Sequence, residues 1–167
     1  MIVTTCPHCM NSIGNEYRQL GGDFKVVHHT ELLAKLAAEG KLRPSAANQS
    51  IAYHDPCYLG RQNGVYDAPR NILRVLTSRT IELPRNREDA FCCGAGGAQF
   101  WKEEESGLEK IAVNRFNEVR QALSKCGGSR TLAVACPFCK SMLSTAPDRA
   151  DSEIRIRDVA ELMLESL

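Results

Sequence analysis

The sequence predicts an α/β fold with a largely parallel sheet and helices on both faces. Short β-branched runs alternate with helical segments along the whole chain, which is the pattern of parallel strands joined by right-handed crossovers. A block near the N-terminus is repeated near the C-terminus. Three cysteines each follow an expected strand, and parallel sheets carry their functional loops at the carboxyl ends of their strands. We therefore expect Cys6, Cys57 and Cys136 to meet at one edge of the sheet.

The expected strands are short runs at residues 1–5, 24–28, 49–54, 80–83, 131–135 and 153–156. The expected helices lie between them, at residues 7–20, 31–39, 106–123 and 159–167, with two more after Asp67 and Cys139. Pro7 suits the first turn of a helix, and Thr30 and Asp158 are expected N-caps. Residues 106–123 are placed in a helix because apolar residues recur there at helical spacing, at Leu108, Ile111, Ala112, Phe116, Val119 and Leu123.

Composition restricts the class of protein. The chain has 167 residues, of which 43% are hydrophobic and 25% charged, as in an ordinary globular domain. The net charge of +1 gives no electrostatic reason to expect a nucleic-acid partner. The sequence has no run of about 18 apolar residues, which is the length needed to span a membrane. Residues 1–6 do not resemble a secretory signal. Eight cysteines in such a chain are expected to be ligands or redox groups rather than disulfides, in a cytoplasmic protein.

The internal repeat divides the chain. Residues 2–9 match residues 132–139 at an offset of 130, and residues 25–30 match residues 153–158. The second copy has Cys57, Cys92 and Cys93 upstream of its CxxC pair, and the first copy has no counterparts. We therefore expect residues 1–45 to be the C-terminal remnant of a first repeat and residues 46–167 to be a complete second repeat. The upstream part of a longer polypeptide, or a partner redox subunit, would complete the first.

The most informative stretch is Cys92-Cys93-Gly94-Ala95-Gly96-Gly97. The side chains of adjacent cysteines diverge, so they suit two irons of one cluster better than one mononuclear metal. The glycines leave the backbone free to form a turn whose N–H groups suit an anion or an iron–sulfur site. The alternative is a glycine-rich turn with two buried thiols. Cys126, which has no motif around it, is expected only to fill apolar space.

Four motifs together resemble a known family: Thr4-Thr5-Cys6-Pro7-His8-Cys9, Tyr53-His54-Asp55-Pro56-Cys57-Tyr58-Leu59-Gly60-Arg61, Phe91 to Gly97, and Ala135-Cys136-Pro137-Phe138-Cys139. They are similar to the cysteine-rich CCG domain of heterodisulfide-reductase-like Fe–S oxidoreductases. The likeness is closer to the C-terminal region of Fe–S oxidoreductases linked to electron-transfer flavoprotein and menaquinone. The gap between Cys93 and Cys136 is longer than the usual motif, which an insertion within residues 106–129 would explain.

The resemblance implies an oxidoreductase component that passes electrons between a flavoprotein donor and a quinone or disulfide acceptor. It implies a [4Fe–4S] cluster, non-cubane in some members, and an association with the inner face of the membrane through other segments or partners. The implied site residues are Cys57, Cys92, Cys93, Cys136 and Cys139, with Gly94 and Gly96 in the cofactor-binding turn. A CxxC pair at a helix N-terminus places both sulfurs near the positive end of the helix dipole, which favours thiolates.

The first CxxC pair has more than one interpretation. Cys6 and Cys9 are interpreted as a partial second cluster site, as a thiol–disulfide oxidoreductase pair, or as residues without chemistry. A zinc site built from both CxxC pairs is chemically feasible, and it would make the protein a non-redox interaction domain. It would leave the double cysteine unexplained.

Four residues other than the cysteines and glycines are candidates for supporting roles. His54 lies three residues before Cys57 and is placed to bond a cluster sulfide or move a proton. Arg61 is either a counter-charge for an anionic cluster or solvated surface. Phe100 and Trp101 either cover the cluster or, as the preferred interpretation, pack in the core.

Overall fold

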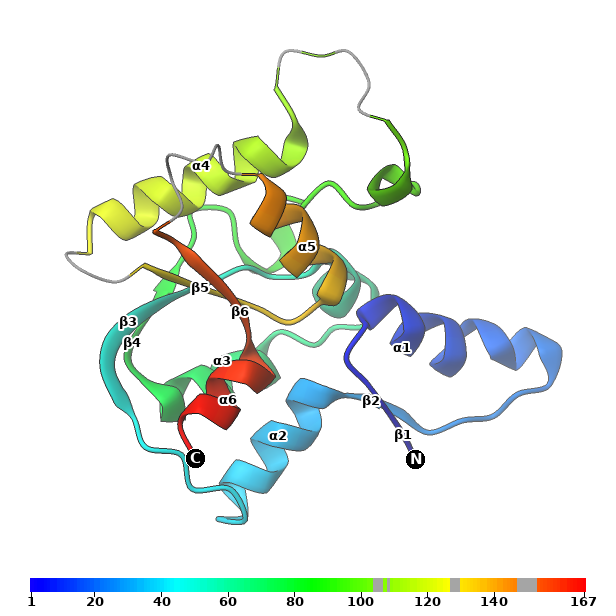
Figure 1. Cartoon of the computed structure of the whole chain (residues 1–167). Helices are drawn as coiled ribbons and strands as arrows, with labels where there is room; N and C mark the ends of the chain where they lie inside the picture. Colours follow the sequence, from blue (N-terminus) through cyan, green and yellow to red (C-terminus); the bar gives the residue numbers. More distant parts are fainter. Residues whose placement is uncertain (104–106, 108, 127–129, 147–152) are drawn as a thin grey trace.

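The computed structural model describes residues 1–103, 107, 109–126, 130–146 and 153–167. It contains a four-stranded sheet in the order β4-β3-β5-β6 and a separate two-stranded sheet, β1-β2, and every pairing is parallel (Figure 1). The strands are β1 (Ile2–Thr4), β2 (Val26–His28), β3 (Ala47–Tyr53), β4 (Thr77–Glu82), β5 (Thr131–Val134) and β6 (Arg155–Asp158). The predicted α/β class with a parallel sheet is confirmed.

The α-helices are α1 (Pro7–Gly14), α2 (His29–Ala38), α3 (Asp67–Leu76), α4 (Ile111–Ser124), α5 (Pro137–Thr145) and α6 (Val159–Glu165). Single turns of other helix types lie at Glu16–Leu20, Tyr58–Gln62, Arg87–Asp89 and Gln99–Trp101. In Figure 1, α4 and α5 lie on one side of the four-stranded sheet and α3 and α6 on the other, and α1 projects away with the β1-β2 pair. Within the described part of the chain, none of the helices has the length and apolar character required to cross a membrane.

Alternating side chains give the sheet two separate cores. On β3, Ile51 and Tyr53 pack with α3 and α6, whereas Ala52 packs with α4 and α5. On β5, Ala133 joins the first core and Leu132 joins the second. Successive side chains of a strand point to opposite faces, so two covered faces need apolar residues at every position. All four residues of β5 are buried, which is the pattern of a central parallel strand.

The chain reverses its direction of travel across the sheet between β3 and β5. After β3 it passes through α3 to β4 on one side, and it then returns to β5 on the other side of β3. The two adjacent strands therefore send their following segments to opposite faces, which leaves a crevice outside their carboxyl ends. The segment with Cys57 follows β3, and Cys136 follows β5.

Two helices differ most from the sequence expectation. The first ends at Gly14 rather than at residue 20, because the Glu16 carboxylate bonds the side chains of Asn11 and Ser12 and the chain tightens into a 3₁₀ turn. Gly21 ends that turn with φ 82°. The helix expected over 106–123 begins at Ile111, and the expected helical residue Leu108 lies outside the described residues.

The structure also corrects the alignment of the two repeats. β2 pairs with β1 in the register in which β6 pairs with β5, so the offset is 130 throughout and His28 corresponds to Asp158. Each of these residues is an N-cap, and its backbone N–H donates to a glutamate three residues on, Glu31 or Glu161, at 2.9 and 2.8 Å. The cap predicted at Thr30 is therefore wrong, because helix α2 begins two residues earlier, whereas the cap predicted at Asp158 is confirmed.

Candidate functional site

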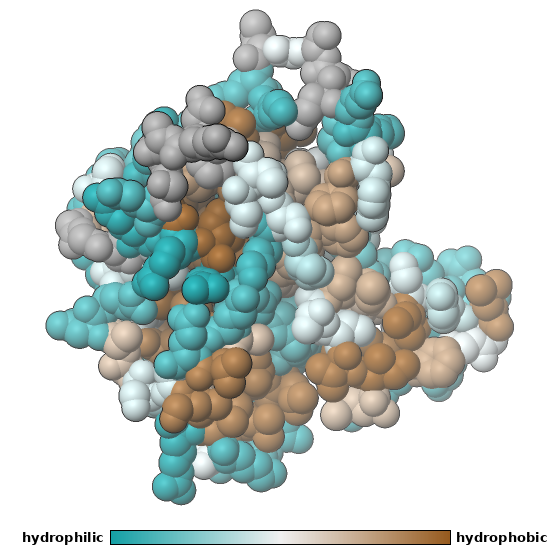
Figure 2. Space-filling view, viewed as in Figure 1, coloured by the Kyte–Doolittle hydropathy of each residue, from teal (hydrophilic) through white to brown (hydrophobic). Residues whose placement is uncertain are grey.

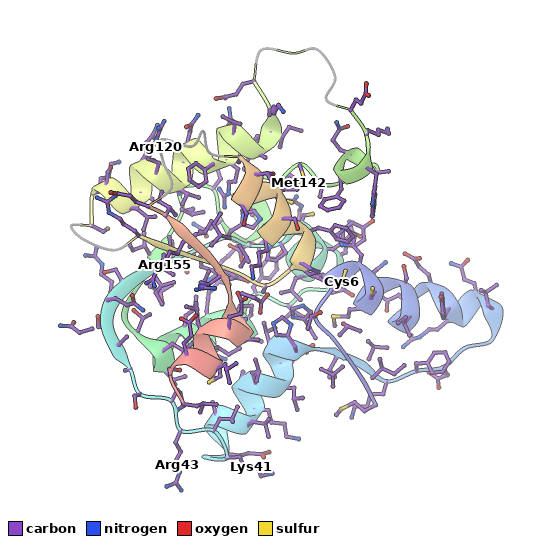
Figure 3. The ribbon with its side chains drawn as sticks, in the orientation of Figure 1. Cys6, Lys41, Arg43, Arg120, Met142 and Arg155 are labelled. Atoms are coloured by element: carbon purple, nitrogen blue, oxygen red, sulfur yellow. The ribbon has the colours of Figure 1, made fainter. Side chains whose placement is uncertain are left out.

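The cysteine segments converge at the crevice beside β3 and β5. Cys6 and Cys136 are the N-cap residues of α1 and α5, and each is followed by a proline in the first helical turn. Cys57 immediately precedes the π-helical turn Tyr58–Gln62. Figure 3 shows Cys6 where the start of α1 meets the start of α5. Cys6 and Cys136 therefore meet as expected, but Cys6 follows a strand of the separate β1-β2 sheet, so the expectation that both lie at the edge of one sheet is wrong.

Six thiols form one hydrogen-bonded series. Neighbouring side chains along it are Cys6, Cys136, Cys139, Cys93, Cys92 and Cys57. The five residues proposed from the sequence as cluster ligands are all in this group. Cys6 is a sixth member, although it belongs to the first repeat. The sequence analysis expected Cys6 to meet Cys57 and Cys136, but it did not count Cys6 among the ligands of their site.

The thiols hold one another in different protonation states. Hydrogen bonds from Cys57 and Cys93, together with the Gly94 N–H at 3.3 Å from Sγ, lower the pKa of Cys92 to about 2. Hydrogen bonding to Cys92 and burial raise the pKa of Cys57. Hydrogen bonds from Cys139 and Cys6 lower the pKa of Cys136. The lowered pKa values favour the thiolate at Cys92 and Cys136, and the thiolate is the form that binds metal.

The glycine turn after the double cysteine has two glycines with positive φ, Gly94 and Gly97, and only Gly94 is also closely packed. Gly94 has φ 90°, a conformation that side-chain-bearing residues rarely adopt, and a Cβ there would lie 3.1 Å from Cβ of Ile111. Its N–H is the group that bonds Cys92. A Cβ added at Gly96 would meet no atom of the described residues within 4 Å, and its φ is not positive, so packing imposes no such requirement there. The turn therefore lies against the start of α4 and directs one N–H at a sulfur.

His54 lies against the same thiols. Its side chain is fully buried, and ligand atoms of His54, Cys93 and Cys139 all lie within 4.8 Å of one another. Nδ1 accepts a hydrogen bond from Nε of Arg115 at 3.1 Å. Burial, followed by the positive charge of Arg115, lowers the pKa of His54 to about 3, so the ring is neutral.

Asp55 fixes the loop that follows β3. Its two carboxylate oxygens accept from the Arg70 guanidinium at 2.7 and 2.8 Å, and Arg87 N–H donates to Oδ2 at 3.0 Å. Arg70 also donates twice to Glu82 at the end of β4. This network ties the Cys57 segment to the loop that leads to the double cysteine. Sequence reasoning quoted Asp55 within a motif without assigning it a role, and the only signal was its place directly after a strand.

Arg61 has a structural role in the same loop. Its NH1 donates to the carbonyls of Glu88 and Ala90, at 3.2 and 2.7 Å, just before the double cysteine. Its positive charge also lowers the pKa of Cys57, against the larger upward effects of Cys92 and burial. Arg61 is an exposed residue, and its role as a counter-charge for a cluster stays a prediction.

Aromatic rings surround the start of α5. The ring of Phe138, between the two cysteines of its CxxC pair, makes edge contacts with Phe100 and Trp101 at 5.4 and 5.6 Å. His8 stacks on Tyr58 at 4.0 Å between centroids. The expectation that Phe100 and Trp101 pack in the core is wrong, because Trp101 is 71% exposed and the pair lies on Phe138 at the surface.

The remaining two cysteines differ from the six. Cys9 is exposed, so within the first CxxC pair only Cys6 joins the sulfur series. Hydrogen bonding to Cys136 and burial raise the pKa of Cys6, which is the opposite of the activation that a nucleophilic thiol needs. Cys126 packs against the apolar core formed by α4, α5 and the sheet, as expected. Whether Cys6 and Cys9 form a partial second site stays a prediction.

The family model described as "Cysteine-rich domain" (CCG) matches residues 51–144, which include all five predicted ligands. The chain belongs to the CCG family. This CCG chain is 42% identical over 170 aligned residues to an "EtfAB:quinone oxidoreductase" of Syntrophomonas wolfei, covering 99% of the chain and 24% of that protein. It is 41% identical to a "Probable iron-sulfur-binding oxidoreductase FadF" of Bacillus subtilis, covering 99% of the chain and 23% of that protein.

A third relative of the CCG chain is one of the subunits of the dihydromethanophenazine:CoB--CoM heterodisulfide reductase of Methanosarcina barkeri. The two are 35% identical, and the match covers 99% of the chain and 40% of that relative. The chain thus spans about a quarter of the two bacterial relatives and two fifths of the archaeal one. No solved structure matches it.

Proposed function

We propose that this chain is the iron–sulfur electron-transfer module of a heterodisulfide-reductase-like oxidoreductase. The observation that carries the proposal is the convergence of five thiols, from three separate segments, into one hydrogen-bonded group at the switch point of a parallel sheet. The names of the relatives point to the same chemistry, since they include an iron–sulfur-binding oxidoreductase and part of a heterodisulfide reductase.

The proposed cofactor is a [4Fe–4S] cluster of cubane or non-cubane type. Its ligands would be Cys57, Cys92, Cys93, Cys136 and Cys139, with Gly94 and Gly96 in the turn beside it. An all-sulfur donor set suits iron–sulfur clusters, and adjacent cysteines suit two irons of one cluster. When bound, the cluster would supply one-electron transfer.

The chain's own residues would set the environment of that cluster. Cys93, Cys136 and Cys139 are buried, so this side of the site excludes water, whereas Cys57 and Cys92 are partly exposed. The Gly94 N–H and the first turn of α5 place positive dipole ends beside the sulfurs. Hydrogen bonds to sulfur and solvent exposure are the main means by which a protein tunes a cluster potential. Electrons would enter or leave on the side of Cys57 and Cys92.

The rest of the oxidoreductase would complete the first repeat. We propose that residues 1–45 are the end of that repeat and residues 46–167 a whole CCG unit. The N-terminal unit exposes large apolar side chains, and Figure 2 shows apolar surface where β1 and β2 lie. The exposed residues are Met1, Val3, Tyr17, Leu20 and Phe24. An upstream segment or a partner redox subunit would cover them, and a flavoprotein donor and a quinone or disulfide acceptor would bind the assembled protein.

Anaerobic reconstitution with iron and sulfide tests the proposal. We expect about four irons per chain, matching acid-labile sulfide, a brown chromophore near 400 nm and an electron paramagnetic resonance signal that changes on reduction. Stoichiometric zinc without acid-labile sulfide would overturn the proposal in favour of a zinc-binding interaction domain. A colourless protein with a reversible disulfide between Cys6 and Cys9 would overturn it in favour of a thiol–disulfide oxidoreductase.

A further inference from the structure

One ring nitrogen of His54 makes a hydrogen bond and the other makes none among the described residues. Nδ1 accepts from Arg115 Nε at 3.1 Å, whereas Nε2 is buried without a hydrogen-bond partner among the described residues. The ring lies beside Cys93 and Cys139, whose sulfur atoms are within 4.8 Å of one of its nitrogens. A buried polar group without a partner is costly and rare, so this nitrogen calls for an explanation.

The bond from Arg115 determines which nitrogen carries the proton. A guanidinium has only donors and stays protonated in proteins, so Arg115 Nε must donate and His54 Nδ1 must accept. A neutral imidazole has one donor and one acceptor nitrogen. Nε2 is therefore the nitrogen that carries the hydrogen and can donate.

We propose that His54 is a positioning residue whose Nε2–H donates a hydrogen bond to a sulfur atom of the group held by Cys93 and Cys139. The proposal rests on the proposed function only for the identity of that acceptor. In the cluster-loaded chain it is a cluster sulfide or a ligating thiolate, whereas in the cluster-free chain Nε2 has no partner among the described residues.

The same argument disfavours His54 as a metal ligand. To bind a metal through Nε2, the ring would have to move its proton to Nδ1. Nδ1–H would then face Nε–H of Arg115, donor against donor, in a fully buried position. Binding a metal would therefore break the hydrogen bond between Arg115 and His54 and leave Nε–H of Arg115 and Nδ1–H of His54 without acceptors. Donation from Nε2–H to sulfur keeps that bond and gives both ring nitrogens a partner.

Arg115 is itself held in place. Its side chain is fully buried, and NH1 donates to Glu118 at 2.5 Å and to the Arg85 carbonyl at 3.0 Å. Glu118 also accepts from Arg85 Nε at 2.6 Å. The guanidinium therefore cannot rotate away from His54 without breaking these bonds. The orientation of the imidazole is built into the packing of α4 against the end of β3.

The expected consequence is a change in reduction potential. Reduction adds negative charge to the cluster, so an N–H···S bond stabilises the reduced form more than the oxidised form. His54→Phe keeps a ring but removes the donor, and it should shift the equilibrium toward the oxidised form by about tenfold, which is about 59 mV for one electron. His54→Gln, whose amide N–H can reach a similar position, should recover most of the shift. Tyr53→Phe is the matched control, because Tyr53 is the buried neighbour on the opposite face of β3.

The test uses the reconstituted chain and these three variants. Potentials come from a redox titration followed by electron paramagnetic resonance, and pulsed measurements on a chain labelled with ¹⁵N-histidine report the coupling to nitrogen. We expect a lowered potential in His54→Phe, recovery in His54→Gln, no change in Tyr53→Phe and only weak nitrogen coupling. Equal potentials in wild type and His54→Phe would overturn the inference, and so would the strong coupling of a directly bound nitrogen.

A measurement on the cluster-free chain separates this inference from the proposed function. Two-bond ¹H–¹⁵N spectra of the imidazole rings identify the tautomer, and the His54→Gln variant assigns the signal. A neutral ring protonated at Nε2 supports the inference, and a ring protonated at Nδ1 contradicts it. If wild type takes up no cluster, the proposed function fails while this result still decides the role of His54.

Discussion

The buried ion pair of Asp55 and Arg70 should be among the most sensitive polar contacts in the protein. The two side chains are 3% and 4% exposed and are joined by hydrogen bonds of 2.7 and 2.8 Å. Asp55→Asn keeps the size of the side chain but removes its charge. In the variant, one of the two side-chain atoms that face the Arg70 guanidinium is an amide nitrogen, so its N–H points at an N–H of Arg70 and no hydrogen bond forms there.

The size of the effect follows from what remains around Arg70. Removing one partner of a buried ion pair costs about 3–5 kcal/mol. Arg70 keeps two hydrogen bonds to Glu82, which is 42% exposed, so its charge is not left alone. We therefore expect a loss near the lower end, about 3 kcal/mol, and a melting temperature lowered by roughly 6–12 °C. Since a domain of this kind has about 5–15 kcal/mol of stability, the variant should still fold.

Urea unfolding under anaerobic conditions measures the loss, and iron content after reconstitution measures its effect on the site. Iron loading should fall as well, because Asp55 also accepts from Arg87 N–H in the loop that leads to the double cysteine. Asp67→Asn is the control, since its pair with Arg87 is 70% exposed on the aspartate side and should contribute at most about 1 kcal/mol. The reasoning is refuted if Asp55→Asn loses less than about 1 kcal/mol, or if the control loses as much.

Three further predictions concern single residues. Cys93→Ser should abolish or convert the cluster while Cys126→Ser retains it, judged by iron and acid-labile sulfide content, and equal losses would mean that the ligands are misassigned. Gly94→Ala should cost about 1–3 kcal/mol of unfolding free energy because of its positive φ, whereas Gly96→Ala should cost well under 1 kcal/mol, and similar urea midpoints would contradict the geometry. Burial, and secondly the charge of the neighbouring His29, lowers the pKa of His28 from 6.5 to about 4. Between these pH values the unfolded chain binds more protons than the folded chain, so the free energy of unfolding should fall as the pH falls from 6.5 to 4. His28→Asn retains an N-cap residue that does not titrate, and its unfolding free energy should depend less on pH over that range; an unchanged slope would exclude His28 as the source.

Local patterns in the sequence determined the class of fold and most of the site. The alternation of β-branched runs with helical segments reflects the periodicities of strands and helices, which each segment carries by itself. The placement of Cys6, Cys57 and Cys136 directly after strands was sufficient to predict that their segments converge, although the shared sheet edge given as the reason holds only for Cys57 and Cys136. The N-cap at Asp158 could also be predicted from local sequence, because a cap depends only on the next three residues.

Contacts between distant segments could be decided only by the tertiary structure. The sequence predicted that Cys6 lies near Cys136 but interpreted it with Cys9 as a separate partial site, and only the packing of α1 near the start of α5 shows its thiol bonded to Cys136. The bonds of Arg70 to Asp55 and of Arg115 to His54 join residues 15 and 61 positions apart, and no local pattern marks either partner. Arginine residues on amphipathic helices usually face solvent. Arg70 and Arg115 are buried because the folded sheet brings hydrogen-bond acceptors within their reach. The groups that orient the sulfur site are therefore in place only in the folded chain.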